Sequence, residues 1–161
     1  MRAFKIAQAG LLLTVLTLPS CAIHAAVSPF AAMAGAWSGG GVLDTSDGAQ
    51  ERLRCRAAYD VGAGGGEMRL NLRCASDSYN FNLTSEVQYN RGAISGSWSE
   101  ATRNASGTIS GRANGSHIQV SARGQNFSAE LSLSTRGNRQ IVSIHPQGTS
   151  VRAVSLELER R

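Results

Sequence analysis

Residues 50–75 read QERLRCRAAYDVGAGGGEMRLNLRCA, and they contain the clearest structural signal in the chain. Apolar and polar residues alternate on both sides of the glycine-rich segment Gly62 to Gly66, which is the pattern of two half-buried strands joined by a turn. The register that matches apolar with apolar residues across this turn also places Cys55 opposite Cys74. The segment therefore predicts an antiparallel hairpin with both cysteines on its apolar face.

The two cysteines predict one disulfide bond, Cys55–Cys74, because directly opposed residues of an antiparallel pair have a suitable spacing. A structural disulfide facing the core is the favoured interpretation, and a redox-active pair is the alternative. A metal site is disfavoured, since after the N-terminal segment only His117 and His145 could join the pair as ligands. We expect neither a metal nor a cofactor.

The alternation of this hairpin continues along the chain in runs of about 6–10 residues separated by turn residues. Apolar residues at helical spacing occur only in a short segment between Val27 and Ala36, which could form a turn of helix. The pattern predicts strands at 35–43, 50–61, 67–75, 79–89, 93–100, 105–113, 116–122, 127–135, 139–145 and 149–159.

Three further turns predict the register of their hairpins, because apolar residues must meet on one face. The turns are Asn114-Gly115, Gly137-Asn138 and Asn90-Arg91-Gly92. The expected pairs are Ile109 with Val120, Gly111 with Ile118, Leu133 with Val142, Leu131 with Ile144, Val87 with Ile94 and Leu83 with Trp98.

Consecutive hairpins with one apolar face predict an all-β fold, an antiparallel up-and-down meander of 8–10 strands closing into a small barrel with one disulfide. A sandwich is the alternative. An outer-membrane barrel would turn the apolar face to lipid, and the glycines of that face and an aromatic content of only 6% disfavour it. The longest apolar runs are also too short for a transmembrane helix.

The N-terminal segment has the features of a secretory signal peptide over residues 1–26. Basic Arg2 and Lys5 precede the apolar run Ala9–Leu18, and small residues follow. Export to the periplasm or the medium is expected, with lipid anchoring through Cys21 as the minority interpretation. Residues 27–34 would form an N-terminal arm and 35–161 a single barrel domain. Without the two leader cations the net charge falls from +5 to +3, which is too weak to indicate nucleic acid.

The motif Gly35-Ala36-Trp37, at the start of the first predicted strand, resembles the Gly-x-Trp signature of calycin barrels such as lipocalins and avidins; a second copy occurs at 96–98. The layout is also similar to that of bacterial periplasmic metalloprotease inhibitors. The resemblance implies that Trp37 closes one end of the barrel and that an arginine stacks on it, with Arg152 and Arg139 as candidates. An inhibitor would act through an exposed arm, Val27–Met33.

Catalysis finds no support in the sequence, because neither histidine lies at a recognisable spacing from an acid or a nucleophile and no nucleophile or phosphate motif occurs. We expect no enzyme. The expected function is an exported, non-catalytic binding module of the bacterial envelope that holds a small apolar ligand or a protein partner. The alternatives are a periplasmic protease inhibitor and a structural envelope component or lipoprotein.

Two sets of residues are candidate sites. Glycines provide space on the apolar face, and the aromatic residues that would line a cavity there are Trp37, Tyr59, Phe81, Trp98 and Phe127, although the same residues would simply fill a narrow barrel. On the polar face, Arg54, Arg56 and Arg73 come together in the predicted hairpin register. These arginines predict a weak anion patch for phosphate-rich envelope material, with an ordinary solvated face as the alternative.

Overall fold

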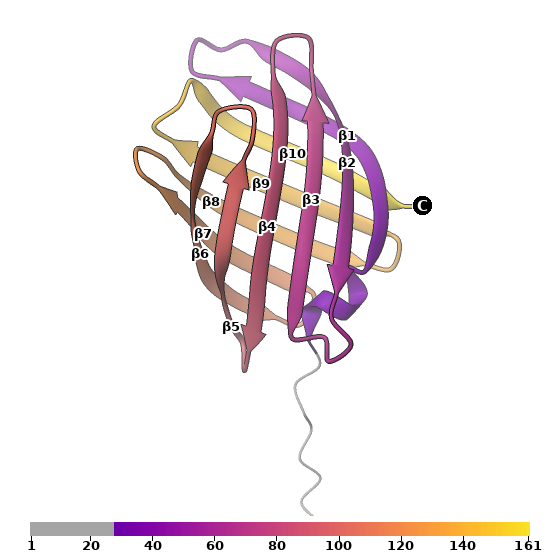
Figure 1. Ribbon diagram of the computed structural model, residues 1–161. Helices are drawn as coiled ribbons and strands as arrows, with labels where there is room; N and C mark the ends of the chain where they lie inside the picture. The colour runs from indigo at the N-terminus through magenta and orange to yellow at the C-terminus, as the bar shows by residue number, and fades with distance from the viewer. Residues whose placement is uncertain (1–27) are drawn as a thin grey trace, which may run out of the picture.

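The computed structural model describes residues 28–161, which form one closed barrel of ten antiparallel strands (Figure 1). Each strand pairs with its neighbours in the sequence, and β1 closes the barrel by pairing with β10. The elements are the 3-10 helix η1 (Pro29–Ala32), β1 (Gly35–Thr45), β2 (Gln50–Val61), β3 (Glu67–Ala75), β4 (Asn80–Asn90), β5 (Ala93–Glu100), β6 (Ala105–Asn114), β7 (His117–Gly124), β8 (Ser128–Arg136), β9 (Arg139–Gln147) and β10 (Val151–Arg160). The predicted meander barrel is confirmed, and the sandwich does not form.

The hairpin of β2 and β3 has the predicted register. Val61 pairs with Met68, and Cys55 pairs with Cys74. The two cysteines form a disulfide bond with their Cα atoms 4.1 Å apart, and both are buried on the inner face. The bond therefore joins adjacent strands within the core, as expected for a structural disulfide, and it favours an oxidising compartment for the protein.

Two other hairpins differ from their predicted registers. Tyr89, rather than Val87, pairs with Ile94, and Ala113, rather than Gly111, pairs with Ile118. The predicted pairs Leu83–Trp98 and Ile109–Val120 are wrong for the same reason: Leu83 faces Glu100 and Ile109 faces Ala122. The β4–β5 turn is tighter than predicted, with positive φ at Arg91 and Gly92. The β6–β7 turn lies one residue later than predicted, with positive φ at Gly115. Each shift moves the partner by two residues, so every apolar side chain keeps its face.

The hairpin of β8 and β9 follows the prediction, because Leu133 pairs with Val142 and Leu131 pairs with Ile144. Its two-residue turn begins at Gly137, which has φ 56°. A glycine at this point of a two-residue hairpin turn adopts the left-handed region at little cost, which holds the register.

The N-terminal arm closes one end of the barrel. Ser28 caps η1 by accepting a hydrogen bond from the backbone N–H of Phe30 at 3.2 Å. Phe30 and Met33 are each only 1% exposed, and Met33 accepts a hydrogen bond through its carbonyl from Trp37 Nε1 at 2.7 Å. The expectation of an exposed contact arm is therefore wrong for these residues, because the arm contributes to the core.

The arginine that stacks on Trp37 is Arg160, at the end of β10, with its guanidinium carbon 4.5 Å from the ring centroid. The expected candidates were wrong. Arg139 instead pairs with Glu157 at 2.7 Å, and Arg152 is exposed near the start of β10. Because β10 pairs antiparallel with β1 to close the barrel, the end of β10 lies beside the start of β1, and Arg160 is directly opposite Trp37.

The expected leader, its cleavage site, Cys21 and Val27 lie outside the described residues. Within residues 28–161, no helix is long and apolar enough to cross a membrane.

Candidate functional site: the barrel interior and its open end

The interior is packed unevenly. The inward apolar side chains of β1, β2 and β10 are buried, including Leu43, Leu53 and Leu158. On the other strands some inward apolar side chains, such as Met68, Ile94 and Val142, are also buried. Others are only half-buried: Leu70, Leu72, Phe81, Leu83, Ile109, Val120, Leu131, Leu133 and Ile144. Because these side chains point towards the barrel axis, solvent reaches them inside the barrel. The interior is therefore lined by apolar side chains that pack against the core, and several of them keep partial contact with solvent.

The wall formed by β5, β6 and β7 has little side-chain bulk around Ile109. On its inner face Ile109 is flanked by Gly96 and Ala122 across the strand pairs, and by Gly107 and Gly111 along its own strand. A Cβ atom at Gly107 would lie 1.8 Å from the carbonyl oxygen of Arg123, so backbone packing itself requires glycine there. The side chains of Val87, Trp98 and Val120 lie within 3.0 Å of where Cβ atoms at these glycines would be, so they cover the glycines. Ile109 is half-buried beside them.

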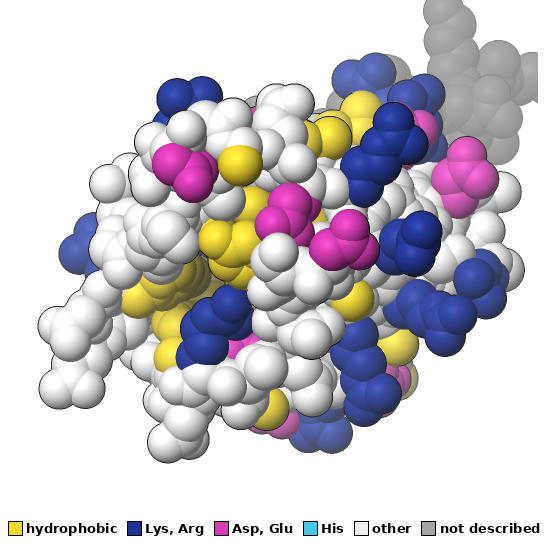
Figure 2. All heavy atoms as spheres, turned by 90° about the horizontal axis from the view of Figure 1, so that it is seen from above, with side chains coloured by type: hydrophobic (Ala, Val, Ile, Leu, Met, Phe, Trp, Pro, Cys, Tyr) yellow, Lys and Arg dark blue, Asp and Glu magenta, His cyan; other side chains and the backbone are white. Residues whose placement is uncertain are grey.

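The interior opens at the end of the barrel opposite to η1. Figure 2 looks onto this end and shows apolar side chains recessed within a rim of loops. The hairpin loops β1–β2, β3–β4, β5–β6, β7–β8 and β9–β10 form this rim (Figure 1). The closed end and the open end give the interior a single direction of entry.

Aromatic residues line part of the rim. Trp98 packs edge to face with Phe127, with ring centroids 5.5 Å apart. Phe81 stacks with Tyr79, with centroids 6.4 Å apart, and the guanidinium carbon of Arg103 lies 4.8 Å from the Phe81 centroid. The entrance therefore has apolar walls with a cation at one point.

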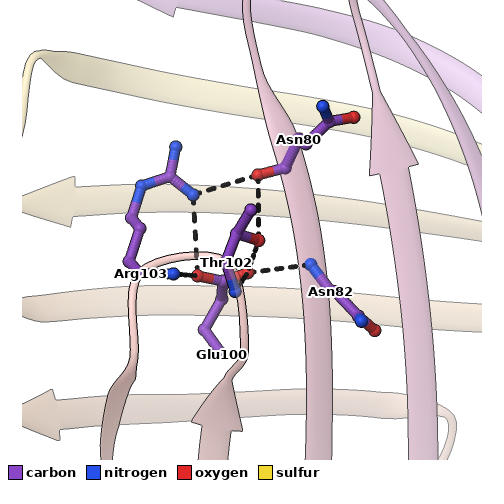
Figure 3. A network of polar contacts seen from close by, with 5 residues as sticks. All are labelled: Asn80, Asn82, Glu100, Thr102 and Arg103. Atoms are coloured by element: carbon purple, nitrogen blue, oxygen red, sulfur yellow. Dashed lines mark hydrogen bonds and ion pairs between the residues drawn. The ribbon is translucent and has the colours of Figure 1, made fainter.

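A polar network around Glu100 shapes the β5–β6 loop (Figure 3). Glu100 is 6% exposed, and its carboxylate accepts hydrogen bonds from the backbone N–H groups of Asn82, Thr102 and Arg103 at 2.9, 3.1 and 2.8 Å. The Thr102 hydroxyl also donates to it, and Arg103 Nη1 lies 3.6 Å away. Arg103 Nη1 donates as well to the carbonyl of Asn80 at 3.0 Å. The carboxylate thus holds the loop to β4.

These contacts determine the ionisation of Glu100. Burial by itself raises the pKa of the carboxyl group, but the hydrogen bonds from Thr102, Asn82 and Arg103 outweigh burial and bring the pKa below its usual value. Glu100 is therefore a carboxylate at neutral pH, and its negative charge is neutralised within the rim.

A second polar group lies at the closed end. The Tyr59 hydroxyl donates to Gln140 Oε1 at 2.7 Å, and Gln140 Nε2 donates to Thr135 Oγ1 at 3.1 Å. All three residues are buried, and burial raises the pKa of Tyr59 above its usual value. Tyr59 also packs edge to face against Trp37. This group is a neutral, hydrogen-bonded part of the core beneath the apolar space.

The five aromatic residues predicted for a cavity all lie inside the barrel or at its rim, but in separate places. Trp37 and Tyr59 belong to the closed end and are buried. Phe81, Trp98 and Phe127 lie at the open end. The sequence reasoning missed Glu100, Arg103 and Gln140. Glu100 was detectable as the polar residue that continues the inward series Ile94, Gly96, Trp98 at the end of β5.

The arginines predicted to form an anion patch are exposed on the outer face, and Arg56 lies directly opposite Arg73. Among residues 28–161, His117 and His145 make hydrogen-bond contacts on the outer face: His117 Nδ1 lies 2.9 Å from Ser134 Oγ, and Nε2 of the exposed His145 lies 3.3 Å from Ser143 Oγ. Within residues 28–161, no three His, Cys, Asp or Glu side chains are grouped so that they could hold a metal ion.

A ten-stranded antiparallel barrel, closed at one end by a tryptophan with a stacked arginine and open at the other, is consistent with a calycin-like fold. The sequence matches no protein-family model, and no curated protein matches it either. Rv2717c from M. tuberculosis has a similar structure, with a TM-score of 0.65 and 12% identity over 84% of this chain and 95% of that chain. The S-type phycobiliprotein lyase CPES from Guillardia theta is also similar, with a TM-score of 0.62 and 11% identity over 82% of this chain and 89% of that chain. At these identities the likeness concerns the fold alone.

Proposed function

We propose that this protein is an exported, non-catalytic binding module of the bacterial envelope that holds a small apolar ligand inside its barrel. One observation carries the proposal: inward-facing apolar side chains of six strands remain reachable by solvent although they point towards the barrel axis. Leaving such surface in contact with water costs roughly 25 cal/mol for each Å² that a ligand would cover. An apolar molecule that fills the space recovers that free energy.

The geometry of the two ends supports binding in preference to catalysis. The plug of Phe30, Met33 and Trp37 gives the space a floor, and the loops at the other end leave an entrance. The ionisable groups near the interior are already engaged: Glu100 in its loop network, and Tyr59 with Gln140. Trp98 Nε1 is buried without a hydrogen-bond partner, but an indole N–H can only donate a hydrogen bond. A general acid or base needs a free group within hydrogen-bond reach of a substrate.

The compartment is inferred from two separate features. The N-terminal sequence predicts a secretory signal, and the Cys55–Cys74 disulfide favours an oxidising environment. Of the alternatives, inhibition of a protease through the arm loses its mechanism, because Phe30 and Met33 are buried. A structural envelope role, with or without a lipid on Cys21, remains the competing proposal and predicts an interior without ligand.

A pair of tryptophan substitutions tests the proposal. Ile109→Trp places a large ring on the inner face of β6, and Ile141→Trp places the same ring on the outer face, where Ile141 is 53% exposed. The probe is anilinonaphthalene sulfonate, whose fluorescence rises in apolar surroundings. We expect the wild-type protein and the Ile141 variant to bind the probe equally and the Ile109 variant to bind at least about tenfold more weakly.

Overpacking of the interior by itself lowers the free energy of unfolding by about 1–3 kcal/mol. Circular dichroism and denaturant unfolding must therefore show that both variants are folded before their probe binding is compared. Native mass spectrometry of the purified wild-type protein provides an independent readout, in which a co-purified apolar molecule adds mass. Equal probe binding by a folded Ile109 variant, or no probe binding by the wild-type protein, would exclude a ligand site in the interior.

A further inference from the structure

The outer face of β2 and β3 carries a concentration of arginines that the interior site does not use. Arg52, Arg54 and Arg56 alternate along β2, about 7 Å apart, and Arg73 faces Arg56 from β3. All four are exposed. We name these four residues, together with Arg161, the arginine face.

Arg161 extends this face across β1. Its Nε donates to Ser38 Oγ at 2.6 Å, and Ser38 is the residue directly opposite Arg56 on β1. Arg161, Arg56 and Arg73 therefore follow one another in a row across neighbouring strands. The residues of β1 that face β2 here are small, with Gly40 opposite Arg54, so the long side chains can spread over the sheet.

The charges of the four strand arginines are not neutralised within the described part of the chain. The ion pairs there involve Arg69, Arg103 and Arg139, and none of the four lies within 4.0 Å of a carboxylate. On the outer face the partners of Arg73 and Arg54 across the strand pairs are Asn82 and Gly40. Outer-face acids lie further along the rows or diagonally: Glu159 and Glu157 of β10 are opposite Ser38 and Gly40, and Asp44 of β1 is two residues from Val42, the partner of Arg52. Of these, Glu157 pairs with Arg139 and Asp44 accepts a hydrogen bond from Gln50.

Like charges directly opposite one another destabilise a sheet unless an anion lies between them. Arg56 and Arg73 are in this position because the disulfide one residue away holds the register. The chain thus maintains an unfavourable contact that a bound phosphate would convert into a favourable one, since each guanidinium offers forked donors.

One exposed apolar side chain lies beside this charge, and another lies three strands away on the same outer face. Among the described residues the exposed large hydrophobic side chains are Val42 and Ile141. Val42 is directly opposite Arg52, and Ile141 lies in the row of Arg54, separated from it by Gly40 and Glu157. A basic residue beside an exposed aliphatic one, as Arg52 is beside Val42, suits a surface that offers phosphates above an apolar layer.

The geometry points to one occupant: we infer that the arginine face docks on the phosphate headgroups of an anionic membrane. Figure 2 shows several Lys and Arg side chains on the right side of the view, with others spread over the rest of the surface. Proteins that bind single-stranded nucleic acid stack the bases on aromatic side chains, and the outward positions of β1, β2 and β3 include none. A docked barrel would keep its open end free to exchange an apolar ligand.

Vesicle co-sedimentation tests the inference with two matched double variants. Arg56→Gln/Arg73→Gln removes the opposed pair, and Arg112→Gln/Arg123→Gln removes the same charge from β6 and β7, on the other side of the barrel. We expect the wild-type protein to bind phosphatidylglycerol vesicles, to release with added salt, and to leave phosphatidylcholine vesicles unbound. The first variant should bind roughly 30-fold more weakly and the second less than about threefold.

Three results of the vesicle experiment would overturn the inference. The first is that the wild-type protein does not bind phosphatidylglycerol vesicles. The second is an equal loss of binding in the two variants, which would indicate that only net charge matters. The third is full release of the protein by millimolar inorganic phosphate at constant ionic strength, which would indicate that the face binds single phosphates. As a control, single-stranded DNA of equal charge should bind more weakly than the vesicles. Tighter binding of the DNA would indicate that the partner is a nucleic acid. Anilinonaphthalene sulfonate binding should be unchanged in both variants, so this test and that of the interior site fail independently.

Discussion

Arg160 lies over the indole ring of Trp37, with its guanidinium carbon 4.5 Å from the ring centroid. The same guanidinium donates hydrogen bonds to the carbonyls of Ala32 and Ala34, and Trp37 Nε1 donates to the carbonyl of Met33. The end of the last strand is thus fastened to the first strand and to the N-terminal arm. This contact joins the two ends of the described chain and closes the barrel.

We predict that Arg160→Ala lowers the free energy of unfolding by about 1–2 kcal/mol, because it removes a cation–π contact and leaves two backbone carbonyls without their donor. Urea unfolding measures the change. Arg152→Ala is the matched control on the same strand, where the side chain is exposed, and it should alter stability by less than about 0.5 kcal/mol. Equal effects of the two substitutions would contradict a closing role for Arg160.

The N-terminal arm should behave as part of the core. Phe30→Ala is expected to destabilise the protein by about 3–5 kcal/mol, because the ring is 1% exposed and its removal leaves a cavity against Tyr89. Ala31→Ser, at an exposed position of the same 3-10 helix, should have little effect. Thermal unfolding of both variants distinguishes this result from that of a free contact arm, in which the Phe30 change would be harmless.

Replacing both cysteines, in Cys55→Ala/Cys74→Ala, should cost about 3 kcal/mol, since the bond closes a loop between residues 19 apart in sequence. A reductant should lower the stability of the wild-type protein by a similar amount and leave that of the variant unchanged. If the stability of the wild-type protein does not change after full reduction of its disulfide, strand pairing alone provides the stability.

Glu100 should make stability depend on pH. Its folded-state pKa is lowered, so the stabilisation is fully present above the unfolded-state pKa and is lost as the pH falls through the folded-state pKa. Glu100→Gln should cost about 1.5–3 kcal/mol at pH 7, because an amide group places a donor against backbone N–H groups. The difference between wild type and variant should narrow as the pH falls below about 4.5.

Denaturant unfolding at a series of pH values measures this difference. Other carboxyl groups with lowered pKa, such as Asp47 and Glu51, titrate in both proteins and cancel in the comparison. Glu130→Gln, at an exposed position of β8, is the control and should give a difference near zero at every pH. A constant gap between wild type and the Glu100 variant would mean that the carboxylate charge does not hold the loop.

Much of the fold was predictable from local patterns. The period-two alternation located all ten strands to within a few residues, and the segment 50–75 carried the register that joins Cys55 to Cys74. That register was readable because a pair of cysteines and three apolar pairs agree on one solution. The turns at Arg91-Gly92 and Gly115 offered several solutions with the same inward face, and only backbone conformation distinguishes among them.

The sequence by itself determined the strands, the inward face, the disulfide and the opposition of Arg56 to Arg73, because each follows from side-chain alternation across one hairpin. Only the tertiary structure decided what depends on closure of the barrel. Closure brings Arg160 onto Trp37 across 123 residues, buries Phe30 in the plug, and leaves Ile109 half-exposed in the interior. These contacts join segments that are distant in sequence. The alternation of apolar and polar residues predicts which face of the sheet a side chain occupies, but it does not predict which distant residue that side chain contacts.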